Sequence, residues 1–236
     1  MIDCDMHIHS IRSTCGFHTL LEIVSIMRGK GQKGFALTDH GPALGTPQSH
    51  FSVMLRRMPT VIEGVRVFKG IESSVMNAEG ELDIPLFPGT KYEVILAGLH
   101  PHDTFTVSQG IEENTRALVN AMRKNPEIRC ITHPTFTNLP VDLDILTDAA
   151  AENNVALEIN NSHLRTSKAN RETIPRLLEL VIEKGVALMV NSDGHMFTEM
   201  GEYAEALAFL EPHGIDRFRV VNRTLESTLE FLGLEK

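Results

Sequence analysis

The chain has 236 residues, 42% of them hydrophobic and 22% charged, which excludes a disordered protein and fits one α/β domain covering residues 1–236. Its formal net charge of -9 argues against a general binder of nucleic acids or of anionic membranes. Three cysteines without CxxC spacing, no signal-peptide pattern and apolar runs too short to cross a bilayer together predict a cytoplasmic protein without disulfides.

Short apolar runs typical of buried strands alternate along the chain with longer helical patterns. The predicted strands are Ile2–Met6, Gly34–Thr38, Val65–Ile71, Val94–Leu99, Ile128–Thr132, Val155–Ile159 and Val186–Asn191. The predicted helices among them are Leu20–Lys30, Glu112–Lys124, Asp144–Asn153 and Asn170–Lys184. Strands that alternate with helices indicate βαβ units and a parallel sheet.

Two further stretches complete the predicted elements. The segment Met76–Lys91 contains two glycines and two prolines, which favours a loop or a hairpin insertion. After the last predicted strand we expect a helix near Glu199–Leu210, a short apolar run Phe218–Val221 and a closing helix Leu225–Leu232. Asn222 or Thr224 is the candidate cap of that closing helix.

Side chains that can bind metals or hydrogen-bond strongly follow the predicted strands at their carboxyl ends. In strand order they are His7 and His9, Asp39 and His40, Glu72, His100, His133, Glu158 and Asn160, and Asp193 and His195. The carboxyl ends of the strands of a parallel barrel converge on one face, so we expect these side chains to meet there. A strand cap or a polar turn could explain each residue alone, but matching positions on separate strands favour a shared metal site. Glu158 and Asn160 fit supporting or substrate contacts as well as structural roles.

The spacing of two histidines supports the same interpretation. Residues two apart in a strand point to the same side, so His7 and His9 can hold one ion from a single rigid element. Asp193 and His195 repeat this spacing at the last predicted strand. His50, His102 and His163 are expected in loops that could face the site, and a ligand role is the less favoured interpretation for each.

The ordered motifs resemble the PHP (polymerase and histidinol phosphatase) family. They are Asp5-Met-His7-Ile-His9, Thr38-Asp39-His40-Gly41, Gly70-Ile-Glu72, Leu99-His100, Thr132-His133-Pro134 and Ser192-Asp193-Gly-His195. The phrases Leu157-Glu-Ile-Asn-Asn-Ser162 and Thr198-Glu-Met-Gly201 are similar to the YcdX-type phosphatase subgroup. The resemblance covers nearly the whole chain.

This resemblance implies a distorted (β/α)7 TIM-like barrel, phosphoesterase activity and three divalent metal ions, usually zinc, with manganese or iron as alternatives. By position, His7, His9, Glu72 and Asp193 would hold the first ion. Glu72 would bridge to a second ion held by His100 and His133, while His40 and His195 would hold the third with a residue from the loop after the first strand. The resemblance also suggests a homo-oligomer such as a trimer.

The sequence departs from the subgroup at one position. Cys15 stands where the subgroup tends to have histidine, and a thiolate is a good zinc ligand. We favour Cys15 as the last ligand of the third ion. His18 could replace it, or Cys15 could be a small buried residue without a metal.

The expected reaction is metal-assisted hydrolysis of a small phosphorylated substrate, with nucleic acid unlikely except as a nucleotide-like molecule. Metal ions lower the pKa of a bridging water, and the resulting hydroxide attacks phosphorus in line. Asp39 and His195 are the candidate catalytic residues, Asp39 either by orienting a ligand or by assisting proton transfer. Arg12, Arg165 and Lys168 lie on loops at the expected site and are the candidate phosphate-binding residues.

Three alternatives differ in class or in substrate. Histidinol phosphate phosphatase is the nearest rival within the same chemistry. An amidohydrolase also uses the HxH pattern and a terminal aspartate, but it typically has eight strands and often a carboxylated lysine, for which no lysine stands at the middle strand ends. A non-catalytic module with a decayed site conflicts with the nearly complete ligand set.

Overall fold

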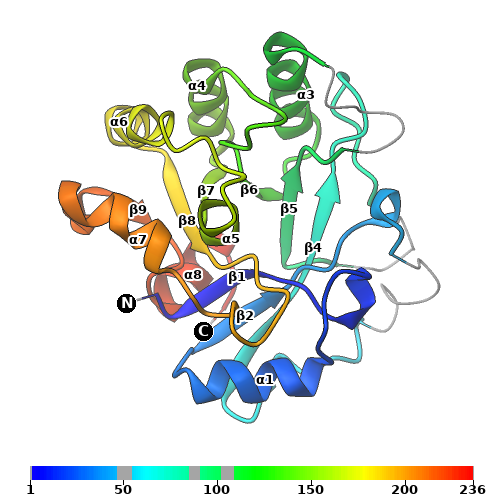
Figure 1. The fold of residues 1–236 in the computed structure, drawn as a ribbon. Coiled ribbons are helices and arrows are strands. Elements are labelled where there is room, and N and C mark those ends of the chain that lie inside the picture. Colours follow the sequence, from blue (N-terminus) through cyan, green and yellow to red (C-terminus); the bar gives the residue numbers. More distant parts are fainter. Residues whose placement is uncertain (1, 47–54, 85–90, 102–108, 236) are drawn as a thin grey trace.

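The computed structural model describes residues 2–46, 55–84, 91–101 and 109–235 of the chain. Its centre is a sheet in which eight strands run parallel in the order β1-β2-β4-β5-β6-β7-β8-β9 (Figure 1). The strands are β1 (Cys4–Ile8), β2 (Gly34–Leu37), β4 (Val65–Ser74), β5 (Val94–Gly98), β6 (Ile128–Ile131), β7 (Ala156–Asn160), β8 (Ala187–Asn191) and β9 (Arg219–Val220). All seven predicted strands form, and the predicted TIM-like α/β fold of parallel strands is confirmed. The predicted count of seven strands is one too low, because β9 forms within the expected apolar run Phe218–Val221 and pairs with β8.

Helices pack against this curved sheet. Their bounds are α1 (Leu20–Gly29), α3 (Ile111–Lys124), α4 (Leu143–Asn153), α5 (Asn161–Arg165), α6 (Ile174–Lys184), α7 (Ala204–Leu210) and α8 (Leu225–Leu232), with short 3-10 turns at Ile11–Ser13, Pro42–Leu44, Glu211–His213 and Ile215–Arg217. Figure 1 shows α3, α4 and α6 in a row along one side and α1 on the opposite side. Within the described ranges, no helix is both long and apolar enough to span a membrane.

Two predicted helices begin later than their sequence patterns indicate. Residues 170–173 form a turn, and α6 begins beside Pro175, whose fixed φ suits the first helical turn. The stretch that begins at Glu199 also forms turns. Gly201 adopts a left-handed φ of 71°, and α7 starts only at Ala204. The structure also adds α5 and the antiparallel strand β3 (Val61–Ile62), for which the sequence offered no separate pattern.

The hairpin and the final cap follow the sequence. Val75 pairs antiparallel with Leu82, and a turn at residues 77–80 reverses the chain, so the described part of the Met76–Lys91 insertion is a hairpin. Thr224 caps α8 by accepting from the backbone N–H of Ser227 at 3.0 Å. Asn222 has another role: its amide group bonds Cys4 and Val190 of two separated strands.

Side chains alternate between the two faces of each strand, and on one face of the sheet they form an apolar layer with polar side chains beyond it. The lower layer is an apolar cluster with members on β1, β2 and β4 through β8, including Phe68, Leu96, Cys130 and Met189, and with Leu229 of α8 packed against it. Two residues farther along a strand, the side chain returns to the same face. On β4 the series Phe68, Gly70 and Glu72 therefore carries the carboxylate onto the same face as the cluster, beyond its apolar layer.

Strand β1 departs from this alternation. Cys4 and Met6 belong to the apolar cluster, so simple alternation would place Ile8 and not His7 or His9 on the same face. The pairing with β2 contains one extra residue, since Asp5 pairs with Phe35 and Ile8 pairs with Leu37. This β-bulge turns Ile8 outward against α1 and aims His7 and His9 into the site.

The two ends of the sheet meet beside this bulge. The His9 N–H donates to the carbonyl of Gly194 at 3.0 Å, and the Gly194 N–H donates to the carbonyl of His7 at 3.3 Å. The buried Asp5 carboxylate accepts from the backbone N–H groups of Ser192 and Gly201. Asp193, which lies between these anchored residues, is thereby held against the two histidines of β1.

Candidate metal centre

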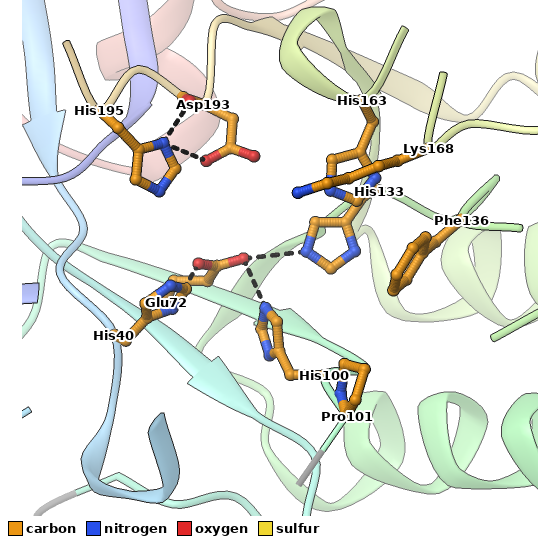
Figure 2. A pocket seen from close by; sticks show the side chains of 10 residues that line it. All are labelled: His40, Glu72, His100, Pro101, His133, Phe136, His163, Lys168, Asp193 and His195. Atoms are coloured by element: carbon orange, nitrogen blue, oxygen red, sulfur yellow. Dashed lines mark hydrogen bonds and ion pairs between the residues drawn. The ribbon is translucent and has the colours of Figure 1, made fainter. Parts of the chain in front are cut away.

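The carboxyl ends of the strands surround a cavity of about 170 Å³ (Figure 2). Its walls are His40, Glu72, His100, Pro101, His133, Phe136, His163, Lys168, Asp193 and His195. Six of these ten residues are ligands predicted from the sequence. His7 and His9 are fully buried below them, so the predicted convergence of distant histidines and carboxylates is what the fold produces.

The first group of ligand atoms lies around the imidazoles of His7 and His9. His7 Nε2 lies 3.1 Å from His9 Nε2 and 3.2 Å from Glu72 Oε2. Asp193 Oδ1 lies 3.5 Å from His7 Nε2 and 3.2 Å from His9 Nε2. With metal–ligand bonds of about 2.0–2.1 Å, the ligands of a tetrahedral zinc ion stand roughly 3.3 Å apart. Of these atoms, those of His7, His9 and Glu72 lie within 4.8 Å of one another and can bind one ion, and Asp193 Oδ1 lies beside both imidazoles.

The other oxygen of Glu72 faces a second group. Glu72 Oε1 lies 3.1 Å from His100 Nε2 and 3.1 Å from His133 Nε2, so one carboxylate can bridge two ions (Figure 2). Ser74 Oγ, at 3.1 Å from His100 Nδ1, fixes the orientation of that ring. A side chain at Gly98 would overlap Thr132 Oγ1 at 2.2 Å and press on both imidazoles, so glycine leaves the room that these rings occupy.

A third group contains the cysteine. The ligand atoms of His9, Cys15, His40 and His195 all lie within 4.8 Å of one another. His195 Nδ1 also lies 2.9 Å from the Asp193 carbonyl oxygen, which orients the ring. His18 is used elsewhere, because its Nε2 accepts from the Phe197 N–H at 3.0 Å. Of the two candidates for the last ligand of this group, the structure brings Cys15 to it.

Two buried atoms show that the cluster suits cations. Glu72 Oε2 and His40 Nδ1 lie 2.8 Å apart but are not aligned for a hydrogen bond, and neither has another hydrogen-bond partner among the described residues. A buried polar atom without a partner costs free energy, and a bound cation removes that cost. The residues present thus fit a group of divalent ions.

The electrostatics of the cluster point the same way. Burial raises the pKa of Glu72, but His7, His100 and His40 hold it well below its usual value. Burial alone would lower the pKa of His7, yet Glu72, Glu158 and Asp193 raise it well above the usual value. Without metal, protons on imidazoles balance these buried carboxylates. Divalent ions would replace those protons, so metal binding is expected to compete with protonation.

The thiol of Cys15 is strongly perturbed. Burial raises its pKa, but hydrogen bonds and charge from His195 and His40 lower it from 9.0 to about 6. The pKa of His40 changes in the opposite direction, because Glu72 and Cys15 outweigh the effect of burial and raise it to about 10. Cys4, by contrast, is buried in the apolar layer, which raises its pKa to about 12. Cys15 is therefore a thiolate at neutral pH and Cys4 is not.

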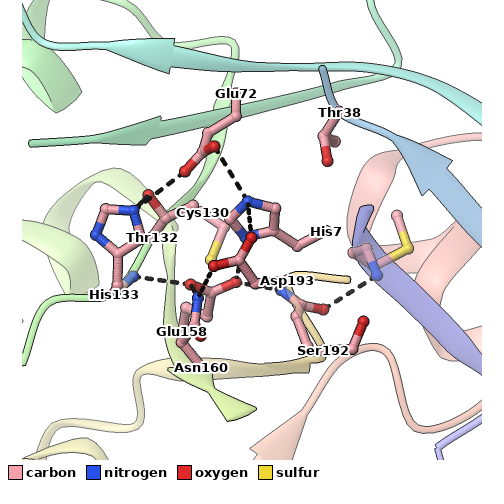
Figure 3. A network of polar contacts seen from close by, with 12 residues as sticks. His7, Thr38, Glu72, Cys130, Thr132, His133, Glu158, Asn160, Ser192 and Asp193 are labelled. Carbon is pink, nitrogen blue, oxygen red and sulfur yellow. Dashed lines mark hydrogen bonds and ion pairs between the residues drawn. The ribbon is translucent and has the colours of Figure 1, made fainter. Parts of the chain in front are cut away.

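Glu158 supports the ligands from behind (Figure 3). Its Oε1 lies 2.8 Å from His7 Nδ1 and accepts from Asn191 Nδ2 at 2.8 Å. Its Oε2 accepts from the His133 backbone N–H at 2.8 Å and from Asn160 Nδ2 at 2.9 Å. Asn160 also donates to Asp193 Oδ2 at 3.2 Å. The sequence left supporting or substrate contacts and purely structural roles open for Glu158 and Asn160, and these contacts support a role in orienting the ligands.

Asp39 acts on the loop that carries Cys15. Its carboxylate accepts from Ser10 N at 2.7 Å and from Ser10 Oγ at 2.8 Å. Ser13 on the same loop contacts His9 Nδ1 at 2.9 Å and accepts from the His40 N–H at 2.8 Å. Asp39 is therefore placed to orient ligands through this loop. Its role in proton transfer stays a prediction.

The three candidate phosphate-binding residues are placed differently. Lys168 lines the cavity and reaches across His133 and His163 (Figure 2). Arg165 is ion-paired with Glu199, and Arg12 lies near Asp39; neither is among the described residues that line the cavity.

His163 was expected in a loop that could face the site; it lies on the helix α5 instead, and it does line the cavity. Its ring stacks on His133 with centroids 4.7 Å apart, and its Nδ1 has no hydrogen-bond partner within the described part of the chain. Burial and His133 lower its pKa to about 3, so it is neutral at neutral pH. No residue spacing pointed to it, because only the packing of α5 brings it to the cavity. His50 and His102 lie outside the described residues.

The fold and the cluster define the class of this protein: a TIM-like α/β protein with metal-capable side chains gathered at the carboxyl ends of its strands. No family model matches the chain. A probable phosphatase of Caldanaerobacter subterraneus subsp. tengcongensis is 35% identical over 230 residues, which cover 97% of this chain and 90% of that protein. A probable phosphatase of Shewanella pealeana is 36% identical over 231 residues, covering 97% and 92% of the two chains. The chain belongs to the family of these probable phosphatases.

A solved structure supports the fold independently. The histidinol phosphate phosphatase of Lactococcus lactis subsp. lactis, in complex with zinc, L-histidinol and phosphate, matches with a TM-score of 0.67 over 90% of this chain and 94% of that one. The two sequences are 15% identical, so the match shows the shared TIM-like fold and does not assign a substrate.

Proposed function

We propose that this protein is a metal-dependent phosphatase of the PHP type, in the YcdX-type subgroup, which hydrolyses small phosphate esters at a site for three divalent ions. The observation that carries the proposal is Glu72, whose two oxygens face two separate sets of imidazoles at 3.1–3.4 Å. A fully buried carboxylate in this position suits a bridge between two cations. Zinc is the ion that best matches these nitrogen-rich sets, with manganese or iron as alternatives.

The residues would share the work as follows. His7, His9, Glu72 and Asp193 would hold the first ion, Glu72, His100 and His133 the second, and His40 and His195 would contribute to the third. Bound ions of this kind lower the pKa of water and neutralise charge that develops on phosphate oxygens. Asp193 contacts His9, and Glu158 accepts from the backbone N–H of His133, so the two acids would hold these histidines in the positions that an in-line attack on phosphorus requires.

The cavity favours a small substrate. A volume of about 170 Å³ accommodates a phosphate group with a small part of its alcohol. The Lys168 ammonium stands at one wall to bind phosphate oxygens, while Pro101 and Phe136 offer apolar surface to the alcohol. The predicted catalytic role of His195 would be exerted as a ligand of the third ion, because its Nδ1–H donates to the Asp193 carbonyl oxygen at 2.9 Å and leaves Nε2 for the ion.

Two competing functions remain to be separated by experiment. A histidinol phosphate phosphatase would use the same residues on one particular ester. An amidohydrolase would need the same metal-capable strand ends but a different reaction, and the relatives named probable phosphatases favour the ester. We further propose a cytoplasmic enzyme that assembles as a homo-oligomer such as a trimer.

The test combines elemental analysis with a screen for hydrolysis. Purified protein should contain two to three equivalents of divalent metal and release phosphate from several phosphomonoesters, histidinol phosphate among them. His9→Ala should lose at least one equivalent and nearly all hydrolysis. His213→Ala, which removes an exposed histidine far along the chain, is the matched control and should change neither value. Turnover of amides but of no phosphate ester would overturn the proposal.

A further inference from the structure

The three groups of ligand atoms differ in chemistry. The first two groups, one of His7, His9, Glu72 and Asp193 and the other of Glu72, His100 and His133, contain only imidazole and carboxylate. The group of His9, Cys15, His40 and His195 contains the one thiol among them and no carboxylate. Thiolates prefer soft or borderline ions, whereas carboxylates and imidazoles also accept harder ones such as manganese.

Local structure holds Cys15 in this group. Ser10 caps the 3-10 turn at Ile11–Ser13, and Thr14 adopts a left-handed φ of 58°, which reverses the chain just before the cysteine. The Cys15 N–H then donates to the Ser13 carbonyl at 2.6 Å, while Ser13 Oγ contacts His9 and His40. One short loop therefore fixes the thiol relative to two imidazoles of the cluster.

The following residues keep the loop in place. The Phe17 N–H donates to the His195 carbonyl at 3.1 Å, and a side chain at Gly16 would overlap the Ser10 carbonyl oxygen at 2.2 Å. The loop is thus packed directly on the strand end that carries His195. The His18 ring contacts Phe197 edge-on at 6.1 Å between centroids and accepts from its N–H, so it stays outside the group.

We propose that Cys15, His40 and His195 form a thiolate centre that selects zinc, cobalt or cadmium over manganese, while the two other centres accept either kind of ion. Because this centre would be the third ion site of the proposed phosphatase, the inference deepens that function. The three ion sites would then differ in metal preference. In a mixture of zinc and manganese, one equivalent of zinc should stay bound while the ions at the other two sites exchange.

Cobalt provides a readout that does not depend on catalysis. The metal-free protein is titrated with Co²⁺ alone, and the near-ultraviolet absorption is followed for a sulfur-to-cobalt charge-transfer band. We expect the band in the unaltered protein, together with three bound equivalents by elemental analysis. In parallel, protein dialysed against an excess of Mn²⁺ with limiting Zn²⁺ should retain one zinc.

Three variants distinguish loss of the thiolate ligand from loss of the whole third ion site. Cys15→Ser should lose the band and one equivalent of metal. Cys15→His should keep three equivalents but lose both the band and the preference for zinc, which shows that a folded third site remains. Cys130→Ala removes a buried thiol outside the groups and should keep the band. Circular dichroism of each variant verifies folding.

The outcomes bear on the two proposals separately. A cobalt-loaded protein without the band, or a band that persists in Cys15→Ser, overturns the thiolate centre even if phosphate esters are hydrolysed. A band lost in Cys15→Ser without any phosphate-ester hydrolysis supports the centre and contradicts the proposed function. Complete replacement of zinc by manganese would also overturn the selectivity.

Discussion

Replacing Glu158 by glutamine tests whether a residue that touches no proposed ion controls metal affinity. Each Glu158 oxygen receives two contacts, His7 Nδ1 and Asn191 Nδ2 on Oε1, and the His133 N–H and Asn160 Nδ2 on Oε2. In Glu158→Gln one oxygen becomes an NH2 group. If the NH2 group takes the place of Oε2, it faces the two N–H donors there. If it takes the place of Oε1, it forces the proton of His7 onto Nε2, the atom that faces Glu72 and Asp193.

Either orientation carries a cost that can be bounded. Two hydrogen bonds to a charged acceptor contribute about 1.5–3 kcal/mol each, and the lower cost of burying an amide offsets part of their loss, which leaves roughly 2–4 kcal/mol in the free energy of unfolding. Loss of the partner that orients a ligating histidine typically weakens metal binding about 10–100-fold. That ratio corresponds to roughly 1.4–2.7 kcal/mol of binding free energy.

The assay is a zinc titration in competition with a chromophoric chelator, together with urea unfolding of the metal-free protein. Glu93→Gln is the matched control, because Glu93 is also largely buried and charge-paired, with Arg66 at 2.6 Å, but lies outside the cluster. We expect the control to lower stability without changing the zinc Kd. A folded Glu158→Gln protein that binds zinc within twofold of the unaltered protein would refute the reasoning.

Three further predictions follow from the same geometry. Removal of metal by a chelator should lower the melting temperature, since an ion at 100 times its Kd stabilises the native state by about 2.7 kcal/mol per site; an unchanged calorimetric transition would contradict this. In the metal-free protein, iodoacetamide should alkylate Cys15 with a rate that is half-maximal near pH 6, because the thiolate fraction rises with pH through that pKa, and zinc should protect it. Buried Cys4, with a pKa of about 12, is the internal control in the mass spectrum, and equal labelling of both thiols would refute the assignment. Lys168→Ala should raise the KM for phosphate esters and weaken inhibition by phosphate about 10-fold, the effect of one charge-assisted hydrogen bond, without loss of bound metal. Arg165→Ala, which removes a residue paired with Glu199, should change neither constant, and equal effects of the two variants would count against the assigned cation.

Much of the cluster of metal-capable side chains could be predicted from the sequence because strand geometry is periodic. Glu72, His100 and Asn160 each lie four positions after an apolar residue of the inner cluster, so strand alternation places their side chains on the same face. Those apolar residues are Phe68, Leu96 and Ala156. The run of seven buried strands and the polar group at each carboxyl end required no knowledge of tertiary contacts.

Other features depend on contacts between segments far apart in the chain. The bulge in β1 exists only in the pairing with β2, and without it His7 and His9 would face α1. Glu158 supports His7, 151 residues away, through a contact that no local pattern encodes.

The choice of Cys15 over His18 and of Lys168 over Arg165 was likewise decided by packing. His18 accepts from the N–H of Phe197, and Arg165 is ion-paired with Glu199. Phe197 and Glu199 follow β8 and come near these loops only because the sheet is curved. Local sequence thus determined which side chains can bind metal, because periodicity acts within a strand. Tertiary structure decided which of the loop residues reach the cavity and the ligand groups, because that depends on where the two ends of the sheet meet.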